Sequence, residues 1–541
     1  MLKKTLVALL VFSMLFSVFA LPVGAAGISR TESRVTAAAD EPSSFLQKLY
    51  HILDKLLNWL LSYMNFYMPK EDWTPKEDYE PVEFYEGLET FDTAADDGAK
   101  WSVGYANASL IAGQNITDGK HYMGGSLSLL EPKTCTGITD DMKVRTFAIS
   151  DGDDGIAVFA VLDAYALCSG DVIEIRKLLA DFAEENNIVS INCSVLHQHS
   201  CVDTLGMNGE LIRALVQNTA THSGLIDVGI HSGRNPEFME NLHKVVAASV
   251  KNAVNSMTEG SLYYGTADVS EFVKDKRDPQ VCDKNLNRLR FVPDDTSKKE
   301  TWIVSGAMHC VGLGADTTEV SGDYPYYIEK NVRQNYNANF VYIQGAQLAI
   351  TVSNPYEGER LDRVMALGET LATRLGAIDN EVSVAPLLNI KLRQIFVPVE
   401  GQVLTLCANV GLFNTTVVDA GAGKYEMVTE VGYMELGNEL AYFFAPGELA
   451  PEIAYGGAIS AAESLTGESW DYPSIQDYIG SGRKLLVFGL TNDEVGYILT
   501  DNDYRSMFSE NEEINCAGDK TGSAVMEGFM ALYDSLVYVT D

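Results

Sequence analysis

Two histidines, His197 and His199, stand two positions apart where the apolar run 188–196 gives way to polar residues. Successive side chains of a strand point to opposite faces, so residues i and i+2 share a face and can reach one point in space. Imidazole nitrogens bind zinc and transfer protons near neutral pH. Because the chain has only 8 histidines in 541 residues, this pair indicates a metal or proton-transfer site more readily than two structural side chains.

Two further residues have the chemistry to complete such a site. A catalytic metal needs about three or four N, O or S ligands and an open position for water or substrate. His309 follows the apolar segment 302–308 and precedes a loop with two glycines, and Glu448 follows a short apolar segment and a Pro-Gly turn that would fix its carboxylate. Taken singly, His309 is equally well explained as a core histidine, and Glu448 is better explained as a solvated turn residue.

The elements that must position these residues are predicted from the apolar pattern. Residues 155–162 and 188–196 are apolar runs of strand length, and 171–187 between them has helical periodicity. This order predicts a right-handed parallel crossover, which puts His197 and His199 at the carboxyl end of a parallel strand, where open α/β sheets bind ligands. Asn235-Pro236 predicts the start of another helix. Further strands are predicted at 301–308, 338–352, 440–445 and 484–490. The fold class is therefore α/β, a large domain with mixed sheets.

The amino terminus has the pattern of a secretory signal peptide. Lys3 and Lys4 precede an apolar run, 5–21, and small residues follow up to Ala26. The pattern predicts that residues 1–26 are a signal peptide cleaved after Ala25 or Ala26, and that the mature protein works outside the cytoplasm. An uncleaved membrane anchor is the alternative interpretation, and no later stretch is apolar for long enough to span a bilayer.

Residues 27–84 are predicted to form an amphipathic helix and a charged linker. Apolar residues recur at helical spacing over 43–67, and the wide apolar stripe includes Trp59 and Phe66. Such a helix can contact a membrane surface, self-associate or pack on the main domain. The linker that follows is rich in charge and proline, so the main domain is predicted to occupy residues 85–541.

Composition excludes some partners. Acidic residues outnumber basic ones 75 to 39, for a formal net charge of −36, which argues against nucleic acid and against attraction to anionic lipid. The 8 cysteines form no CxxC pair and are too sparse for a disulfide scaffold. Cys193 and Cys201, which flank the two histidines, could form a disulfide or be buried thiols.

The ordered segments between Trp101 and Tyr504 resemble the neutral and alkaline, non-lysosomal ceramidase family, zinc amidases that cleave the N-acyl bond of ceramide. Leu196-His197-Gln198-His199-Ser200 is similar to the family's T-H-x-H-S segment, whose first histidine binds zinc and whose second helps in catalysis. The resemblance therefore implies that His197 is a zinc ligand and that His199 is the acid/base or the substrate-polarising group.

Other segments imply the remaining ligands. Residues 283–291, 302–309 and 321–325 resemble the stretch around the family's second zinc histidine, which makes His309 a ligand. Residues 446–452 are similar to the family's P-G-E segment, which makes Glu448 the third ligand, with Glu452 as the less favoured substitute.

Residues 492–498, with Tyr504 seven positions beyond Tyr497, resemble the segment whose tyrosine approaches the metal. Tyr497 would be the fourth ligand or an oxyanion donor. Arg288 corresponds to the family's arginine that contacts the reacting group, although Arg290 is close enough to replace it in this comparison. The implied cofactor is one Zn²⁺ per chain.

One segment departs from the family pattern. Characterised ceramidases carry a Gly-Asp-x-Ser-Pro segment with a catalytic serine, and the corresponding stretch here is 344–353. Leu348-Ala349 replaces the Gly-Asp pair, Val352 replaces the proline, and Thr351 replaces the serine unless Ser353 serves instead. Thr351 keeps a hydroxyl group, but an apolar strand is expected where the family has a polar turn.

The resemblance implies a secreted zinc-dependent amidohydrolase that cleaves ceramide, or a related N-acyl lipid or small N-acyl amide, to a fatty acid and a sphingoid base or amine. The altered segment, and the lack of room beyond Tyr504 for the family's C-terminal immunoglobulin-like domain, leave two alternatives. The chain could hydrolyse a different N-acyl amide, or be a metal- or lipid-binding protein that has lost turnover. A phosphoesterase would want a run of aspartates for two metals, and the chain offers none.

Overall fold

The computed structural model describes residues 49, 52–59, 62, 73–125, 132–152, 155–209, 232–409, 411–505 and 515–539. The predicted signal peptide, residues 1–26, lies outside these ranges. Residues 52–59 are helical, as predicted, with Ile52 and Trp59 exposed and Leu57 buried; most of the remainder of 43–67 lies outside the described residues. Among the residues described, no helix is long and apolar enough to cross a membrane.

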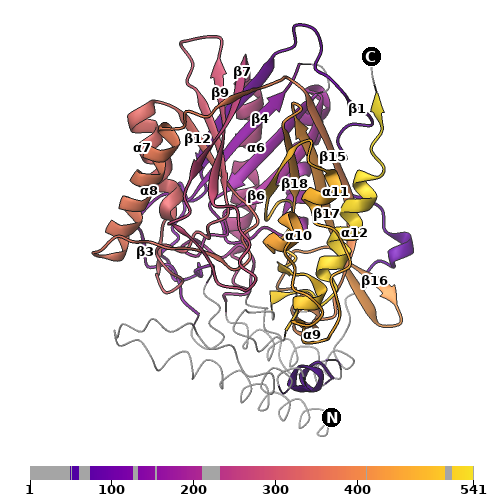
Figure 1. The fold of residues 1–541 in the computed structure, drawn as a ribbon. Coiled ribbons are helices and arrows are strands. Elements are labelled where there is room, and N and C mark those ends of the chain that lie inside the picture. Colours follow the sequence, from indigo (N-terminus) through magenta and orange to yellow (C-terminus); the bar gives the residue numbers. More distant parts are fainter. Residues whose placement is uncertain are drawn as a thin grey trace.

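A nine-stranded mixed sheet forms the larger half of the fold (Figure 1). Its strand order is β12-β10-β9-β7-β2-β4-β5-β6, with β14 paired to β7. The pairs β5–β6 and β10–β12 are parallel, and the other pairs are antiparallel. The bounds are β2 Trp101–Ser109, β4 Lys143–Ser150, β5 Ile156–Leu162, β6 Ile188–Val195, β7 Thr258–Asp268, β9 Asn285–Pro293, β10 Thr301–Gly306, β12 Asn339–Gln344 and β14 Val382–Val384.

A five-stranded sheet forms the second half. Its order is β15-β17-β18-β20, with β16 paired to β17, and only β18–β20 is parallel. The bounds are β15 Leu388–Pro398, β16 Val417–Gly421, β17 Lys424–Leu436, β18 Leu440–Phe444 and β20 Lys484–Phe488. Four two-stranded ladders complete the set: β1 Phe91–Asp92 with β22 Tyr538–Val539, β3 Gly137–Ile138 with β11 Glu319–Val320, β8 Val273–Asp275 with β13 Ile350–Val352, and β19 Glu448–Leu449 with β21 Tyr497–Ile498.

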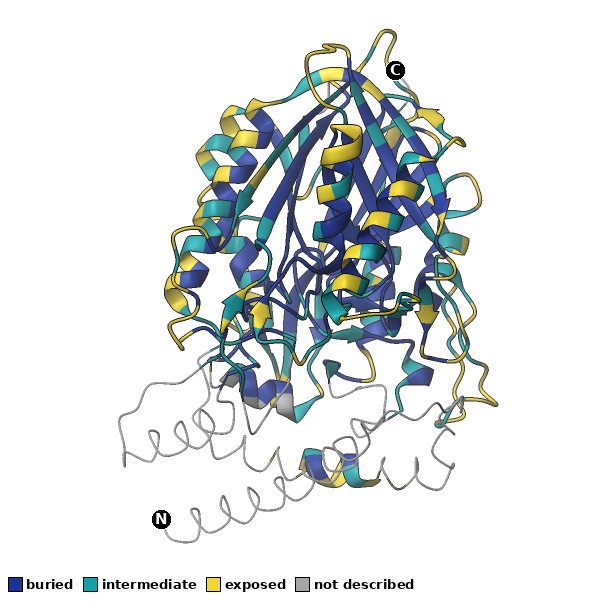
Figure 2. Ribbon diagram, turned by 90° about the vertical axis from the view of Figure 1, so that its left-hand side faces the viewer, coloured by how far each residue is buried: buried dark blue, intermediate teal, exposed yellow. Residues whose placement is uncertain are grey.

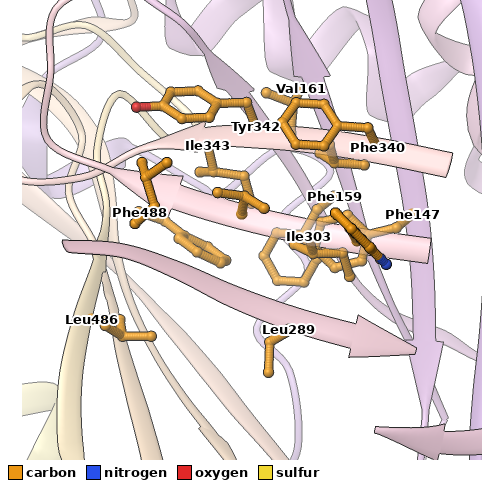
Figure 3. Close-up of a cluster of buried hydrophobic side chains, with 14 of the residues drawn as sticks. Phe147, Phe159, Val161, Leu289, Ile303, Phe340, Tyr342, Ile343, Leu486 and Phe488 are labelled. Atoms are coloured by element: carbon orange, nitrogen blue, oxygen red, sulfur yellow. The ribbon is translucent and has the colours of Figure 1, made fainter. Parts of the chain in front are cut away.

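The two sheets pack face to face around an aromatic core (Figure 3). The ring of Phe159 on β5 contacts Phe444 of β18 and Phe488 of β20 edge-on, with ring centroids 5.5 and 5.7 Å apart. Alternate residues of β5 enter different clusters: Phe159 and Val161 face the second sheet, whereas Val158 and Ala160 face the helices outside. Burial of both faces explains why this strand reads as a continuous apolar run.

Helices cover the outer faces of both sheets, with their buried residues turned inward (Figure 2). On the nine-stranded sheet lie α3 Ser169–Lys177, α4 Ala180–Glu185, α6 Pro236–Asn255, α7 Asp323–Tyr336 and α8 Arg360–Gly376. The five-stranded half carries α12 Thr521–Tyr533 together with α10 Pro451–Tyr455 and α11 Ile475–Ile479. Besides residues 52–59, the described part of the chain also contains α9 Gln402–Asn409, η1 Lys76–Asp78 and η2 Asp501–Asp503.

The predicted crossover is confirmed, because β5 and β6 are parallel neighbours joined through α3 and α4. The helix predicted over 171–187 is two helices, and the break lets Leu179 enter the core while Leu178 stays exposed. The strand predicted over 338–352 is likewise two, β12 and β13. A turn separates them, in which Ala349 has a left-handed φ of 62°. The helix predicted from Asn235-Pro236 is α6, and the Asn235 side chain accepts a hydrogen bond from the amide of Phe238.

The described part of the predicted linker packs on the five-stranded sheet. Trp73 meets Tyr425 with ring centroids 4.5 Å apart, and Tyr79 meets Phe396 at 6.1 Å. These contacts join residues 73–79 to the body of the protein, upstream of the predicted start of the main domain at residue 85.

The sheet also brings distant strand ends together. Through the ladder, β10 and β12 run opposite to β5 and β6. Each strand is rotated by roughly 20–25° relative to its neighbour. This twist accumulates across the sheet from β6 to β12, so that the carboxyl ends of β6, β10 and β12 can meet. Gln344, the last residue of β12, donates from Nε2 to the carbonyls of Leu196 and Met308 at 2.9 and 3.0 Å. Those two carbonyls precede the candidate histidines.

Candidate metal centre

Three histidines converge where β6 and β10 end. His197 and His199 follow β6, His309 follows β10, and one ring nitrogen of each lies within 4.8 Å of those of the others. The pair does not sit on a strand as predicted, because the chain turns at His197, which has a left-handed φ of 51°. The rings of His197 and His199 are nevertheless 5.0 Å apart, so the predicted proximity is correct although its geometric reason is different.

Backbone carbonyls fix the orientation of all three rings. The Nδ1 atoms of His197, His199 and His309 lie 2.9, 2.9 and 3.1 Å from the carbonyl oxygens of Tyr165, Gly125 and Ile350. A carbonyl only accepts hydrogen bonds, so each Nδ1 carries a proton, and Nε2 is the nitrogen that each neutral ring would offer to a metal. The rings are therefore held in the tautomer that a metal ligand needs.

Glu448 brings a carboxylate to the same point. Its two oxygens lie 3.2 Å from Nε2 of His197 and 3.1 Å from Nε2 of His309. Gln347, from the turn after β12, donates to the carboxylate at 3.4 Å. Two ligand atoms about 2.0–2.1 Å from a tetrahedral zinc ion stand about 3.3 Å apart, so these spacings match those of ligands to a single ion.

The short ladder β19–β21 sets Glu448 beside Tyr497. The two strands are parallel, and Glu448 is directly opposite Tyr497. In-register residues of a parallel pair point to the same face of the ladder, so the backbone presents both side chains to one side. Tyr497 is partly buried and packs against the core of the five-stranded half. Its role as a ligand or an oxyanion donor stays a prediction.

Burial controls the charge of this cluster. Desolvation lowers the pKa of His197 to about 4 and the pKa of His199 well below its ordinary value, so both imidazoles are neutral at pH 7. Burial alone would raise the pKa of Glu448, but the surrounding histidines hold it below its usual range. The Nε2 atom of His199 is buried and has no hydrogen-bond partner among the described residues. The site therefore offers the neutral imidazoles of His197 and His199, the Glu448 carboxylate and a buried Nε2 atom of His199 that has no hydrogen-bond partner in the described structure. Imidazole nitrogens and a carboxylate are ligands that fit zinc.

The other predicted residues lie at different distances from the cluster. Thr351 comes directly after Ile350, whose carbonyl holds His309; its catalytic role stays a prediction. Arg288 is engaged elsewhere: its guanidinium group lies 4.5 Å from the centroid of the Trp302 ring and donates to Glu381 at 2.8 Å and to the carbonyl of Leu375. None of these partners belongs to the histidine cluster.

The two less favoured substitutes also have other surroundings. Arg290 pairs with Glu381 and Glu300 at 2.6 and 3.0 Å. Burial raises the pKa of Glu452 to about 7, and the charged residues that act on it are Arg277, Asp503 and Asp275. Of Glu448 and Glu452, the carboxylate that the structure brings to the histidines is that of Glu448.

Sequence reasoning missed three residues at this site. The ring of Tyr165 lies 4.4 Å from that of His197, Gln347 donates to Glu448, and the Glu494 carboxylate approaches Nδ1 of His197 to 3.9 Å. Tyr165 follows β5, the parallel neighbour of β6, so its place at a strand end was a usable signal. No sequence pattern distinguished Glu494 from its acidic neighbour.

A pocket opens from the His197 and Glu448 side of the cluster, with a volume of about 600 Å³ that includes open solvent. Glu494 and Tyr165 line it next to the cluster. The rest of its wall is mostly apolar, from Leu205, Met207, Leu404, Phe413, Met427 and Val495. An apolar wall with a few polar groups at one end is typical of a site for an amphiphilic small molecule.

The segments that carry the family resemblance also hold the site together. Asp323 accepts hydrogen bonds from the amides of Gly312 and Leu313, in the loop after His309. Asn492 accepts from the amide of Cys193, near the end of β6. These side chains connect loops that are far apart in the chain.

Cys193 and Cys201 are both thiols, so the disulfide considered for them is not formed.

Comparison with known proteins finds structural relatives. The crystal structure of neutral ceramidase from Pseudomonas aeruginosa matches with a TM-score of 0.58 and 16% identity, over 82% of this chain and 76% of that chain. A ceramidase complexed with C2 matches with a TM-score of 0.56 and 14% identity, over 81% and 76%. No protein-family model and no curated protein match the sequence. The chain therefore has the neutral ceramidase fold, as its sequence predicted.

Proposed function

We propose that this protein is a secreted, zinc-dependent amidohydrolase that cleaves the N-acyl bond of ceramide or a related N-acyl lipid. The observation that carries the proposal is the convergence of three oriented imidazoles and Glu448 at one end of an apolar pocket. The ceramidase fold supports the class of reaction. Export is supported by the signal-like amino terminus, and contact of helix 52–59 with lipid by its exposed Ile52 and Trp59.

In this proposal, His197, His309 and Glu448 hold the ion, with Tyr497 as the fourth ligand or a donor to the substrate oxygen. When bound, zinc would act as a Lewis acid and would make water acidic enough to be a nucleophile near neutral pH. Amide hydrolysis also needs a group that moves a proton, because the amine is a poor leaving group until it is protonated.

His199 has the geometry for that proton transfer. Its Nδ1 is fixed on the carbonyl of Gly125, and its Nε2 is unpartnered within the described structure. Nε2 accepts the proton that the attacking water loses as the C–O bond forms. It then gives the proton to the amide nitrogen as the C–N bond breaks, leaving a carboxylic acid and an amine. Protons and bonds balance without another reactant.

Hydrolysis of a fluorescent N-acyl sphingosine by the purified mature chain tests the proposal. We expect fatty acid release that a chelator abolishes and zinc restores, together with one zinc per chain by metal analysis. A folded protein that holds one zinc and does not hydrolyse this substrate would contradict ceramide as the substrate and direct the search to other N-acyl amides. A folded protein that binds no zinc would contradict the zinc-dependent reaction itself.

Gly125, whose backbone packs against His199, gives a further prediction. Gly125 has a φ of 77°, and a Cβ there would lie 2.6–2.8 Å from the Cα, Cβ and Cγ atoms of His199. Gly125→Ala should displace the ring and lower turnover by about 10- to 100-fold, the usual cost of disturbing a group that orients a ligand or base. Steady-state kinetics measures the effect.

Gly119→Ala is a matched control, because Gly119 has a φ of 80° and nothing lies within 4 Å of the position that a Cβ would take there. It imposes the same backbone strain without the collision. Equal losses of turnover in the two variants would show that the collision with His199 is not the cause.

A further inference from the structure

Glu494 is an acidic residue of the pocket that has no role in the proposed reaction. Its side chain is 5% exposed, and it lines the pocket beside Glu448. One carboxyl oxygen, Oε1, accepts a hydrogen bond from the amide of Gly496 at 3.1 Å. The other, Oε2, is buried and has no hydrogen-bond partner in the described structure. A buried polar atom without a partner costs free energy unless a ligand satisfies it.

The surroundings of Oε2 restrict what such a ligand can be. Oε2 lies 3.9 Å from Nδ1 of His197, but that nitrogen already donates to the carbonyl of Tyr165. Among the described residues that line the pocket there is no lysine or arginine. An anionic head group would therefore face Glu448 and Glu494 with no basic side chain to receive it.

A hydroxyl group matches this carboxyl best. A carboxylate only accepts a hydrogen bond, whereas a carboxylic acid also donates one, and a hydroxyl group can do both. A hydroxyl group can therefore hydrogen-bond to Glu494 in either protonation state. An ammonium group only donates and suits the ionised carboxylate, whereas a carboxylate group only accepts and suits the protonated acid. Oε2 of Glu494 lies 3.9 Å from the ring of His197, a candidate metal ligand. A substrate hydroxyl group bound to Glu494 would therefore be separated by only a few bonds from an amide that reacts at the metal.

We infer that Glu494 binds a hydroxyl group on the polar part of the substrate and selects N-acyl amino alcohols over N-acyl amines without a hydroxyl group. The inference rests on the proposed function in that the bound amide is hydrolysed, whereas the binding of the hydroxyl group by Glu494 does not depend on that reaction. The apolar wall takes the acyl chain, and Glu494 reads the short head group beside the cluster. A site built to bond a substrate hydroxyl discriminates against the analogue that lacks it, because its own polar group is then left unpaired.

The test compares N-lauroyl ethanolamine with N-ethyl lauramide, which differ only by that hydroxyl group. Calorimetry on the chelator-treated chain should show at least about tenfold tighter binding of the hydroxylated ligand by the wild type. Glu494→Met keeps the side-chain volume and should bring the two affinities within about twofold of each other. Glu494→Gln, which can still form hydrogen bonds, should keep part of the preference. Glu369→Gln, an exposed change of equal charge on α8, should keep all of it.

Equal affinities in the wild type, a preference that survives in Glu494→Met, or no binding of either ligand would overturn the inference. Equally tight binding of N-lauroylglycine would do so too, because that ligand presents a carboxylate. If Glu494→Met does not fold, the wild-type and Glu494→Gln measurements still decide. Hydrolysis is then measured on the zinc-loaded protein. Selective binding without hydrolysis would contradict the proposed function and leave the role of Glu494 intact.

Discussion

Replacing His309 by alanine is expected to abolish zinc binding and to lower amide hydrolysis by at least about 1,000-fold, the scale on which loss of essential catalytic groups acts. His309 supplies one of the two nitrogens that approach Glu448, with its Nε2 3.1 Å from the carboxylate. Without it, the proposed set is reduced to His197, Glu448 and Tyr497, with a single nitrogen ligand, and should not hold the ion at useful affinity. Metal content after dialysis and turnover of the fluorescent amide measure the two effects.

His199→Ala separates the roles within the cluster. If His199 transfers the proton and does not bind zinc, this variant keeps one zinc per chain and loses turnover to a similar degree. Loss of zinc from His199→Ala would instead assign His199 as a ligand. Retention of zinc by His309→Ala would contradict the ligand set proposed here. Circular dichroism of each variant shows whether the fold is intact.

Removal of the Arg145 guanidinium group is expected to have the largest effect on stability. Arg145, on β4, pairs with Asp163 at 2.6 Å and with Glu329 of α7 at 2.7 Å, and all three side chains are at most 3% exposed. Arg145→Met would leave the buried Asp163 carboxylate without its cation and Glu329 with only the more distant Lys143 and Arg333. Breaking a buried ion pair in this way typically costs about 3–5 kcal/mol. Urea unfolding followed by circular dichroism measures the change in the free energy of unfolding.

A matched triple variant tests that explanation. Arg145→Met combined with Asp163→Asn and Glu329→Gln removes the charges as well as the cation, so it should recover part of the lost stability. Lys143→Met, which removes the more exposed cation 3.3 Å from Glu329, should cost clearly less than Arg145→Met, because Arg145 still pairs with that carboxylate. A loss below about 1 kcal/mol in Arg145→Met would show that the triad contributes little.

The sequence predicted the fold where local patterns are strong. The apolar runs of β5 and β6 and the helical periodicity between them predicted the crossover, and Asn235-Pro236 predicted the start of α6. Local patterns could not show that β10 and β12 turn through the twisted sheet to meet β6, because that approach depends on the whole strand order. The break between α3 and α4 was also missed, since no glycine or proline marks it.

For the site, residue types and family resemblance together identified His197, His199, His309 and Glu448, which the structure brings together. Arg288 was selected on its type and its position in a matching segment, but its partners are Glu381, Leu375 and Trp302. Backbone carbonyls that orient the rings carry no side-chain signal, so their part could not be predicted. The altered segment around Thr351 was treated as a departure from the family, yet the carbonyl of Ile350 there holds His309 in place.

The thiols of this protein are a natural reporter of unfolding. All eight cysteines lie in the described part of the chain and none is in a disulfide; seven are buried and Cys282 is half-buried. Burial raises the pKa of Cys193 to about 12, and only the thiolate form reacts readily. An alkylating reagent should therefore modify Cys282 alone in the native protein and reach the others only as the chain opens. The number of labels per chain over time would then report the lifetime of the folded state, with or without metal and without reference to any substrate.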